Sequence, residues 1–457
     1  MRSTQKVEVR DLIDRQPLNR FLMMLVGMSF LAIIMDGFDI SIMGLIAPKL
    51  RSDWGLSHDA LGSILTSALV GQAIGAISGG SIADRFGRRP VMLASVFCIG
   101  LCTLATAFST DVPMMIASRF LTGLGLGAII PSTTALISEY APKKIHSILV
   151  TVTLCGFTVG AAGGGFLAAW MVPAFGWHSI LYVGGIFPIL LGVALTFILP
   201  ESLSFLLTHR RVRSERAAEK ILTRIDPQNP TSSDELYVAD ASEGRIGAIA
   251  TVVAPRYRSG TALMCFGYFC VLFLIFLFNS WLPTLIKEGG GYSLAESAIA
   301  TAMFQLGGPI GSIVIGWAMD RWRGNLVLAF DFLIAGCAAG AIGQVSEHYS
   351  LICALTFVAG FCLGGGSVGM TAYCASYYPT SARATGTSWM LGIGRLGAVL
   401  SAATGAAMLT LGWSLPRIFL ALVVPALIAA VVMLVMKRFS STSNESSHGS
   451  ESAEVSI

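Results

Sequence analysis

Residues 79–89 read GGSIADRFGRR, and residues 315–325 read IGWAMDRWRGN. The Asp-Arg pairs of these two segments are 236 residues apart. A second pair of segments, GLGLGAIIPSTTALISEYAP at 123–142 and GFCLGGGSVGMTAYCASYYP at 360–379, repeats at an offset of 237. Two loci with nearly equal offsets indicate an internal duplication, with both copies in the same orientation. The chain is therefore predicted to contain two similar halves.

The composition places both halves in a membrane. The chain of 457 residues is 54% hydrophobic and only 12% charged, whereas soluble domains carry about 25% charged residues. We expect an all-α membrane protein with 12 transmembrane helices in two six-helix bundles. The apolar segments that predict these spans lie near 21–47, 59–82, 91–109, 113–138, 148–172, 177–199, 260–285, 295–318, 325–345, 349–377, 386–411 and 415–436.

The spans divide the chain into five parts. Within the polar stretch that separates the bundles, LTHRRVRSERAAEKILTRI predicts a basic amphipathic helix and DPQNPTSSDE predicts a flexible linker. The serine-rich end of the chain is expected to be disordered. The predicted organisation is an N-terminal segment at 1–20, a bundle at 21–199, a linker at 200–258, a bundle at 259–437 and a disordered tail at 438–457.

The basic residues predict the orientation in the membrane. Apart from Arg119 and Arg395, which lie inside spans, nearly all Lys and Arg residues fall on the side of the two termini. By the positive-inside rule, both termini, the linker and the tail are therefore expected to be cytoplasmic. The charges form short clusters between apolar segments, which does not favour a nucleic-acid partner. The loops on the opposite side hold Lys49, Arg51, Lys287 and Arg417.

Several chemistries are disfavoured. The nine cysteines all lie in apolar segments, and no CxxC pair or adjacent His indicates a metal site. No phosphate-binding loop is found, so coupling to ATP is not expected. The first apolar run is far longer than the apolar core of a signal peptide and should remain in the membrane as the first helix. We expect a protein that is not an enzyme and uses no cofactor.

Two carboxylates lie inside the first span, in IIMDGFDISIMG at 33–44. Asp36 is about 22 Å along this helix, near the middle of the bilayer, and Asp39 is one turn further on. At this spacing the two side chains share a face, and two acids in a low dielectric do not both ionise easily. A charge at this depth is costly, so a functional role in proton coupling is favoured over a merely structural bond to a neighbouring helix.

Two arginines are the complementary charges. Arg395 lies about 17 Å into the eleventh span, close to the depth of Asp36, and its flanking glycines leave room for a planar guanidinium. It is predicted to bind a substrate carboxylate or to hold an aspartate until substrate arrives, against the alternative of a permanent structural pair. Arg119, in the fourth span, could pair with Asp39, bind substrate, or snorkel to the outer headgroups.

The sequence resembles the major facilitator superfamily over residues 20–437. The segment Gly80, Asp84, Arg85, Gly87, Arg88 and Arg89 matches its loop 2–3 motif G-x-x-x-D-R-x-G-R-R/K, whereas the second copy at Asp320 and Arg321 departs from that motif. Arg119, Gly123, Gly125 and Gly127 match its helix 4 motif R-x-x-x-G-x-G-x-G. "PES" at 200–202 is also typical of its solute porters. The resemblance implies two bundles that rock to give alternating access.

A narrower resemblance is to the aromatic acid:proton symporters of this superfamily. It is carried by DGFD in the first helix, by APKLRSDWGLS after it, and by YPTSARATGTSWMLGIGRLGA at 378–398. The resemblance implies import of benzoates, hydroxybenzoates and related carboxylates across the bacterial inner membrane. The wider resemblance to the superfamily implies a charge lock in which Asp84 and Arg88 hold the cytoplasmic side closed, with the start of the eleventh helix near Arg383 as the candidate partner of Asp84. The alternative is simple positive-inside anchoring, which explains the arginines but not Asp84. Other gating residues are then Gly80, Arg85, Glu139, Asp320 and Arg321.

An aromatic substrate needs stacking surfaces and groups that bind ring hydroxyls. Taken singly, a residue of this kind is more often a packing residue than a part of the pocket. The candidates for substrate binding, besides the two arginines, are Phe38, Asn279, Trp281, Gln305, Tyr373 and Trp389.

The predicted mechanism is proton-coupled import by a protein expected to be a monomer. Asp36 or Asp39 would take a proton, the carboxylate would dock on Arg395 or Arg119, and the bundles would rock. We favour Asp36 for pairing with Arg395 and Asp39 for proton entry. The alternatives are a symporter of another organic acid such as a dicarboxylate, a proton-coupled drug exporter, and a sensor of aromatic acids.

Overall fold

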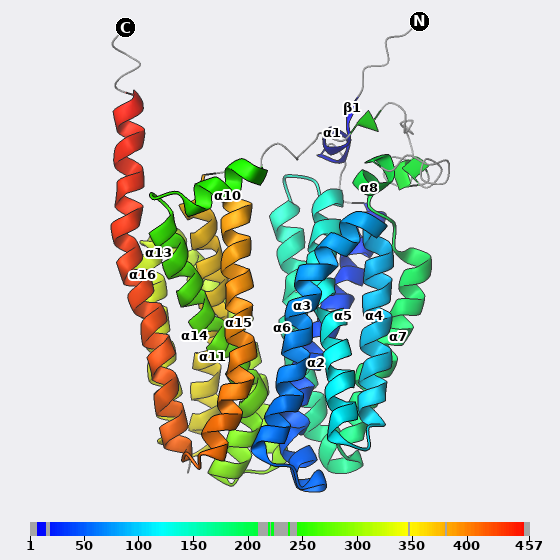
Figure 1. Ribbon diagram of the computed structural model, residues 1–457, viewed down its shortest axis with the longest axis vertical. Coiled ribbons are helices and arrows are strands. Elements are labelled where there is room, and N and C mark those ends of the chain that lie inside the picture. Colours follow the sequence, from blue (N-terminus) through cyan, green and yellow to red (C-terminus); the bar gives the residue numbers. More distant parts are fainter. Residues whose placement is uncertain are drawn as a thin grey trace, which may run out of the picture. The chain divides into compact units, whose positions relative to one another are not determined.

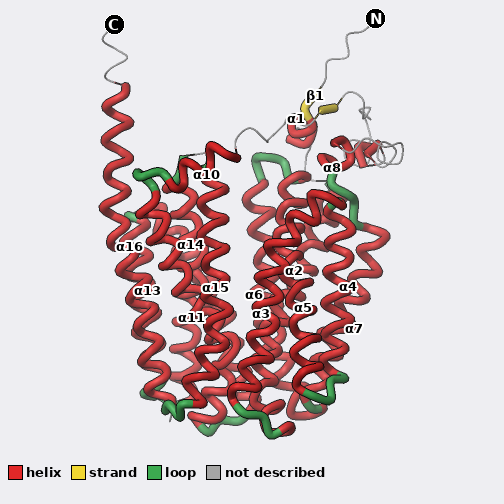
Figure 2. The backbone as a smooth tube through the Cα atoms, in the orientation of Figure 1, coloured by secondary structure: helices red, strands yellow, loops and turns green. Residues whose placement is uncertain are grey.

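The fold is described from a computed structural model of the chain. The residues that it describes are 7–14, 19–208, 218–219, 221–223, 236–237, 245–345, 348–379 and 382–451. The flexible linker predicted at 226–235 and most of the amphipathic helix predicted at 207–225 lie outside them. Within the described residues, the backbone is almost entirely helical (Figure 2).

Twelve of the described helices are long and apolar enough to cross a membrane, which confirms the prediction of a multi-pass all-α membrane protein. Figure 1 shows them as long ribbons. The first six are α2 (Arg20–Trp54), α3 (His58–Phe86), α4 (Arg88–Ala107), α5 (Val112–Tyr140), α6 (His146–Phe175) and α7 (Trp177–Ile198). The second six are α11 (Arg258–Gly290), α12 (Leu294–Arg321), α13 (Gly324–Ile342), α14 (Tyr349–Tyr377), α15 (Arg383–Thr410) and α16 (Leu415–Glu451).

The remaining described elements are short. Two-residue strands, β1 (Val7–Glu8) and β2 (Leu236–Tyr237), pair in parallel. The short helices are α1 (Val9–Asp14), α8 (Leu203–Thr208) and α10 (Arg245–Val253).

Local sequence sets where the long helices begin and end. Gly87 adopts a φ of 100° between α3 and α4, a conformation that only glycine tolerates well. The Asp111 side chain accepts a hydrogen bond from the backbone of Met114 and caps α5. Ser293 and Glu296 form a reciprocal capping box at the start of α12. These signals permit sharp turns between antiparallel helices.

The end of α16 differs from the sequence prediction. The sequence predicts a disordered tail from residue 438, whereas α16 continues to Glu451. Serine-rich sequence nucleates a helix poorly, but α16 is already nucleated by its apolar part, and adding residues to an existing helix avoids the nucleation cost.

The helices form two compact units. One unit contains α2 as far as Ile42, α3 from Ser67, and α4, α5, α7 and nearly all of α6. The other contains α11–α16 together with residues 43–66, which are the end of α2 and the start of α3. The sequence assigns residues 43–66 to the first bundle, at 21–199. In the structure these residues group with the second unit.

The duplicated glycines bring equivalent helices together in the two units. A Cβ on Gly75 of α3 would overlap the carbonyl of Leu124 on α5, and one on Gly127 of α5 would overlap the carbonyl of Gln72 on α3. In the other unit, Gly311 of α12 meets Phe361 of α14 in the same way, and its position is 236 residues after Gly75. Small residues let membrane helices approach closely, and at α3 and α5 this approach positions the site described next.

Candidate functional site

Two carboxylates of α2 point into the first unit. Asp36 is 0% and Asp39 3% exposed. Gln72 of α3, itself 5% exposed, donates from Nε2 to Oδ1 of Asp36 over 3.0 Å. Gln72 was not among the predicted site residues, although a glutamine inside an apolar span, one residue after a glycine that contacts α5, is a signal that could have identified it.

Arg119 of α5 lies fully buried beside the second carboxylate. Its Nη1 is 3.0 Å from Oδ1 and 3.1 Å from Oδ2 of Asp39. The predicted pairing of Arg119 with Asp39 is therefore confirmed. The alternative that Arg119 snorkels to the headgroups is wrong, because its side chain has no exposed surface. An opposite charge within hydrogen-bonding distance offsets the cost of burying each of them.

Hydroxyl groups complete the surroundings of this guanidinium. Nε donates to Thr106 over 3.0 Å, and Nη2 donates to Thr103 and to Thr122, each over 3.1 Å. With the two bonds to Asp39, these interactions account for all five N–H donors of an arginine side chain. Arg119 can therefore offer a two-pronged bond to a substrate carboxylate only by giving up partners that it already has.

The hydroxyls also connect the two charges to their neighbours. Thr103 of α4 donates to Oδ1 of Asp39 over 3.2 Å, and the hydroxyls of Thr106 and Ser118 lie 2.9 Å apart. We call Asp39, Arg119, Thr103, Thr106 and Thr122 the buried ion-pair site. A fully bonded polar cluster in a low dielectric is rigid, and removing one member leaves its partners unsatisfied.

Phe38, between the two acids in sequence, turns to the other side of α2. It is 8% exposed, and its ring lies where side chains on Gly164 of α6 and Gly184 of α7 would otherwise stand. The Phe38 ring therefore packs between helices and does not lie beside Asp36 and Asp39.

A second charge cluster lies at the end of the first unit where α4 begins. Arg88 forms an ion pair with Glu139 of α5. The carboxylate of Glu201, in the "PES" segment, accepts hydrogen bonds from the backbone N–H groups of Arg88 (2.8 Å) and Arg89 (3.1 Å). A carboxylate at a helix N-terminus is favourable because it satisfies free N–H groups.

The predicted lock residues divide between this cluster and the surface. Arg88 and Glu139 are brought together, and Glu201 joins them although the sequence analysis gave it no role. The Arg85 guanidinium lies over the ring of Phe86. Gly80 is half-buried, and the residues that the structure leaves exposed are Asp84, Arg85, Asp320, Arg321 and Arg383.

In the second unit, two predicted amide residues meet. Nε2 of Gln305 on α12 donates to Oδ1 of Asn279 on α11 over 2.9 Å, and Nδ2 of Asn279 donates to the carbonyl of Ile275. Both are buried. On the same two helices, the rings of Phe278 and Phe304 stack with centroids 5.1 Å apart. The pair can offer amide groups to a polar ligand at this depth of the membrane.

Three other predicted substrate residues lie on α14 and α15. Arg395 is half-buried. Tyr373 is half-buried, and Trp389 is 40% exposed.

Trp281 is a packing residue by its contacts. Its side chain has no exposed surface, its indole N–H donates to the carbonyl of Ala402 on α15 over 3.0 Å, and its ring fills the space beside Gly405. A stacking surface for a ligand needs an open ring face, which Trp281 does not have.

Replacing Trp281 with Phe should therefore reduce stability rather than substrate affinity. The variant loses one buried hydrogen bond, worth about 1 kcal/mol, together with part of the ring packing. We expect a lower melting temperature of the detergent-solubilised protein and an unchanged KM for uptake. An increase in KM at an unchanged melting temperature would instead support the substrate contact that the sequence analysis proposed.

The end of α2 and the start of α3 pack on α11 and α15. A Cβ on Gly44 would overlap the backbone carbonyl of Asn279, and one on Gly62 would overlap the side chain of Ala406. We call these two contacts, with the ion pair and hydrogen bond described next, the outer contact cluster, because it lies at the side predicted to be extracellular.

Charged groups cap the outer contact cluster. Arg51 lies 2.5 Å from Glu288 of α11, and His58 lies 4.0 Å from the same carboxylate. Thr410 of α15 donates to Asp59 over 2.8 Å. None of these contacts was predicted from the sequence. Arg51 and Glu288 are 237 residues apart, and Asp59 and Thr410 are 351 apart, so no local sequence pattern links them.

The comparisons with known proteins agree with this architecture. A family model described as Major Facilitator Superfamily matches residues 29–260 and 264–456. The chain is 42% identical over 433 residues to the 4-hydroxybenzoate transporter PcaK of Pseudomonas aeruginosa, covering 94% of this chain and 96% of that protein. It is 39% identical over 428 residues to a gallate transporter of Pseudomonas putida, covering 94% of each.

A solved structure shows the same fold at low identity. The bacterial homolog of the human lysosomal transporter Spinster, in an inward-facing and unoccupied conformation, matches with a TM-score of 0.72 at 14% identity. The match covers 93% of this chain and 98% of that one. Taken with the twelve spans, the repeated glycine contacts and the family model, this identifies the chain as a member of the major facilitator superfamily.

Proposed function

We propose that the protein is a proton-coupled symporter that imports small aromatic carboxylates across the bacterial inner membrane, with both termini in the cytoplasm. Relatives about 40% identical along almost the whole chain carry the names of 4-hydroxybenzoate and gallate transporters. The charge distribution of the loops supports the orientation. The transport chemistry is supported by the buried ion-pair site.

The observation that carries the coupling is the Asp39–Arg119 pair, with Asp36 one helical turn away. A proton that arrives at Asp39 neutralises the carboxylate, and Arg119 is then a buried cation without a counter-charge. Such a state is costly, and an anion entering the protein offsets part of that cost. Proton and carboxylate thereby favour each other's binding, which is what symport requires.

In this scheme Arg119 acts through Asp39: while Asp39 is charged, all five N–H donors of Arg119 have partners, and once Asp39 is protonated its positive charge attracts the anion. The substrate carboxylate is assigned to Arg395. The ring hydroxyl is assigned to the Asn279–Gln305 pair, and the open ring face to Trp389 or Tyr373. Gln72 holds Asp36 in place through its hydrogen bond to Oδ1.

The proposal is tested with the purified protein in liposomes, by following uptake of labelled 4-hydroxybenzoate with an imposed pH gradient. We expect accumulation that requires a more acidic outside and that is inhibited by benzoate and gallate but not by succinate. Inhibition by succinate, with no effect of the aromatic acids, would identify a dicarboxylate symporter. Uptake that is independent of the gradient would refute proton coupling.

Replacing Arg395 with Lys should raise the KM for 4-hydroxybenzoate about tenfold, because an ammonium keeps the charge but loses the planar two-pronged donor. Initial rates over a range of concentrations measure this. The matched control is Arg417→Lys, whose parent guanidinium lies over the ring of Trp413 in the outer region of the second unit. Equal KM values for Arg395→Lys and the parent would refute the two-pronged contact.

A further inference from the structure

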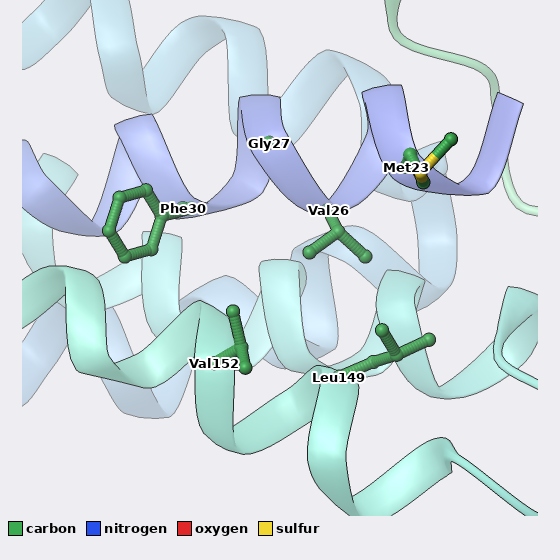
Figure 3. A pocket seen from close by; sticks show the side chains of 6 residues that line it. All are labelled: Met23, Val26, Gly27, Phe30, Leu149 and Val152. Carbon is green, nitrogen blue, oxygen red and sulfur yellow. The ribbon is translucent and has the colours of Figure 1, made fainter. Parts of the chain in front are cut away.

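An apolar crevice lies between the beginnings of α2 and α6. It encloses about 260 Å³, and Figure 3 shows its walls facing one another from the two helices. None of the side chains that line it carries a polar group, and the Cβ position of Gly27 at its centre has no atom within 4 Å. The lining residues are Met23, Val26, Gly27, Phe30, Leu149 and Val152.

The crevice is separate from the buried ion-pair site. Phe30 and Asp39 are nine residues apart on α2, which is about 900° of helical rotation, so they point to opposite sides of the helix. The two acids lie against α3, α4 and α5, whereas the crevice lies against α6. A role in proton coupling does not account for it.

Basic side chains stand at the open end of the crevice. Arg20 begins α2, one turn before Met23, and its side chain is exposed. Lys143 and Lys144, also exposed, lie just before α6 and about one and a half turns from Leu149. At this end Asp14 accepts a hydrogen bond from the backbone of Lys143 over 2.8 Å. The rim therefore has a positive balance of charge among the described residues.

The length and polarity of the crevice match a lipid rather than a small solute. From Met23 to Phe30 it extends about 10 Å along α2, or two thirds of the roughly 15 Å hydrocarbon depth of one leaflet. Met23 and Val152 are 56% and 47% exposed, as is usual for apolar side chains that face acyl chains. A wall that guides an aromatic anion would need polar groups along its length, and this wall has none.

We propose that this crevice binds one acyl chain of an anionic phospholipid, whose phosphate lies on Arg20, Lys143 and Lys144. Hydrocarbon below the membrane surface and cations at the surface are the pattern by which membrane proteins select anionic headgroups. The inference is independent of the transported substrate, because it depends only on the membrane-spanning helices and on the charges at their ends.

The test is native mass spectrometry of the full-length protein, released from micelles that contain equal amounts of phosphatidylglycerol and phosphatidylethanolamine. We expect wild type to retain phosphatidylglycerol preferentially. A triple variant with Arg20→Gln, Lys143→Gln and Lys144→Gln should lose that preference by about tenfold or more. Gly27→Leu, which fills the crevice, should lose bound lipid of both kinds.

The matched control is Gly163→Leu, because Gly163 lies on α6 and its Cβ position is also open. This variant should retain lipid like wild type, and melting temperatures verify that all variants are folded. Equal retention of the two lipids by wild type would overturn the proposal, and so would full retention by Gly27→Leu. Displacement of the lipid by millimolar 4-hydroxybenzoate would overturn it in favour of a solute-binding wall.

Discussion

Asp39→Asn should abolish the accumulation of substrate that an imposed pH gradient drives. Asparagine has nearly the same shape as aspartate but cannot carry the proton, and it leaves the fully buried Arg119 without a counter-charge. Breaking a buried ion pair in this way costs about 3–5 kcal/mol of stability. We expect gradient-driven uptake at the level of protein-free liposomes and a clearly lower melting temperature.

Exchange and stability measurements separate the coupling role from a structural one. Counterflow, in which labelled substrate exchanges for unlabelled substrate without a gradient, should persist in Asp39→Asn if the residue carries the proton. The double variant Asp39→Asn with Arg119→Gln removes both charges and should recover much of the stability, since the two effects are coupled, while uptake stays uncoupled. Gradient-driven accumulation in Asp39→Asn would refute the assignment of the proton to Asp39.

Gly44→Ala should hold the outer side of the transporter open. The added methyl group overlaps the carbonyl oxygen of Asn279, so α2 and α11 cannot approach as they do in the outer contact cluster. Overpacking of this kind costs about 1–3 kcal/mol, which shifts a two-state equilibrium by about 5-fold to 150-fold. Because a transporter must close each side in turn, we expect the initial rate of uptake to fall by a comparable factor.

The conformational shift can be measured directly by thiol labelling. Thr284 of α11 is buried in the structure, so a Thr284→Cys probe, in a protein whose nine native cysteines are replaced, should react slowly with a membrane-impermeant reagent from outside. Gly44→Ala should accelerate this reaction. The control is Gly163→Ala, which adds the same methyl group where there is open space. Unchanged labelling together with normal uptake in Gly44→Ala would show that the Gly44–Asn279 contact is not part of closure.

The sequence identified the buried charges because a carboxylate or arginine inside an apolar span is conspicuous by its cost alone. The repeat offset and the twelve spans follow from patterns within single helices or between duplicated segments. The pairing of Asp39 with Arg119 was one of several alternatives, and only the structure decided between them. The sequence could not decide which partner each of the two acids meets. Asp36 was favoured for charge pairing, whereas the structure gives Arg119 to Asp39 and the amide of Gln72 to Asp36.

The contacts that cross between distant helices were decided only by tertiary structure. The hydroxyls of Thr103, Thr106 and Thr122 look like ordinary small polar residues in sequence, and only helix packing directs them at one guanidinium. The same holds for Trp281, which resembled a stacking surface until its ring was placed against α15. Hydropathy and spacing specify which face of a helix is buried, but the neighbour that covers this face depends on how glycines let the helices approach. The sequence by itself therefore determined the duplicated membrane fold and its costly charges, and the packing of helices far apart in the chain determined which groups those charges meet.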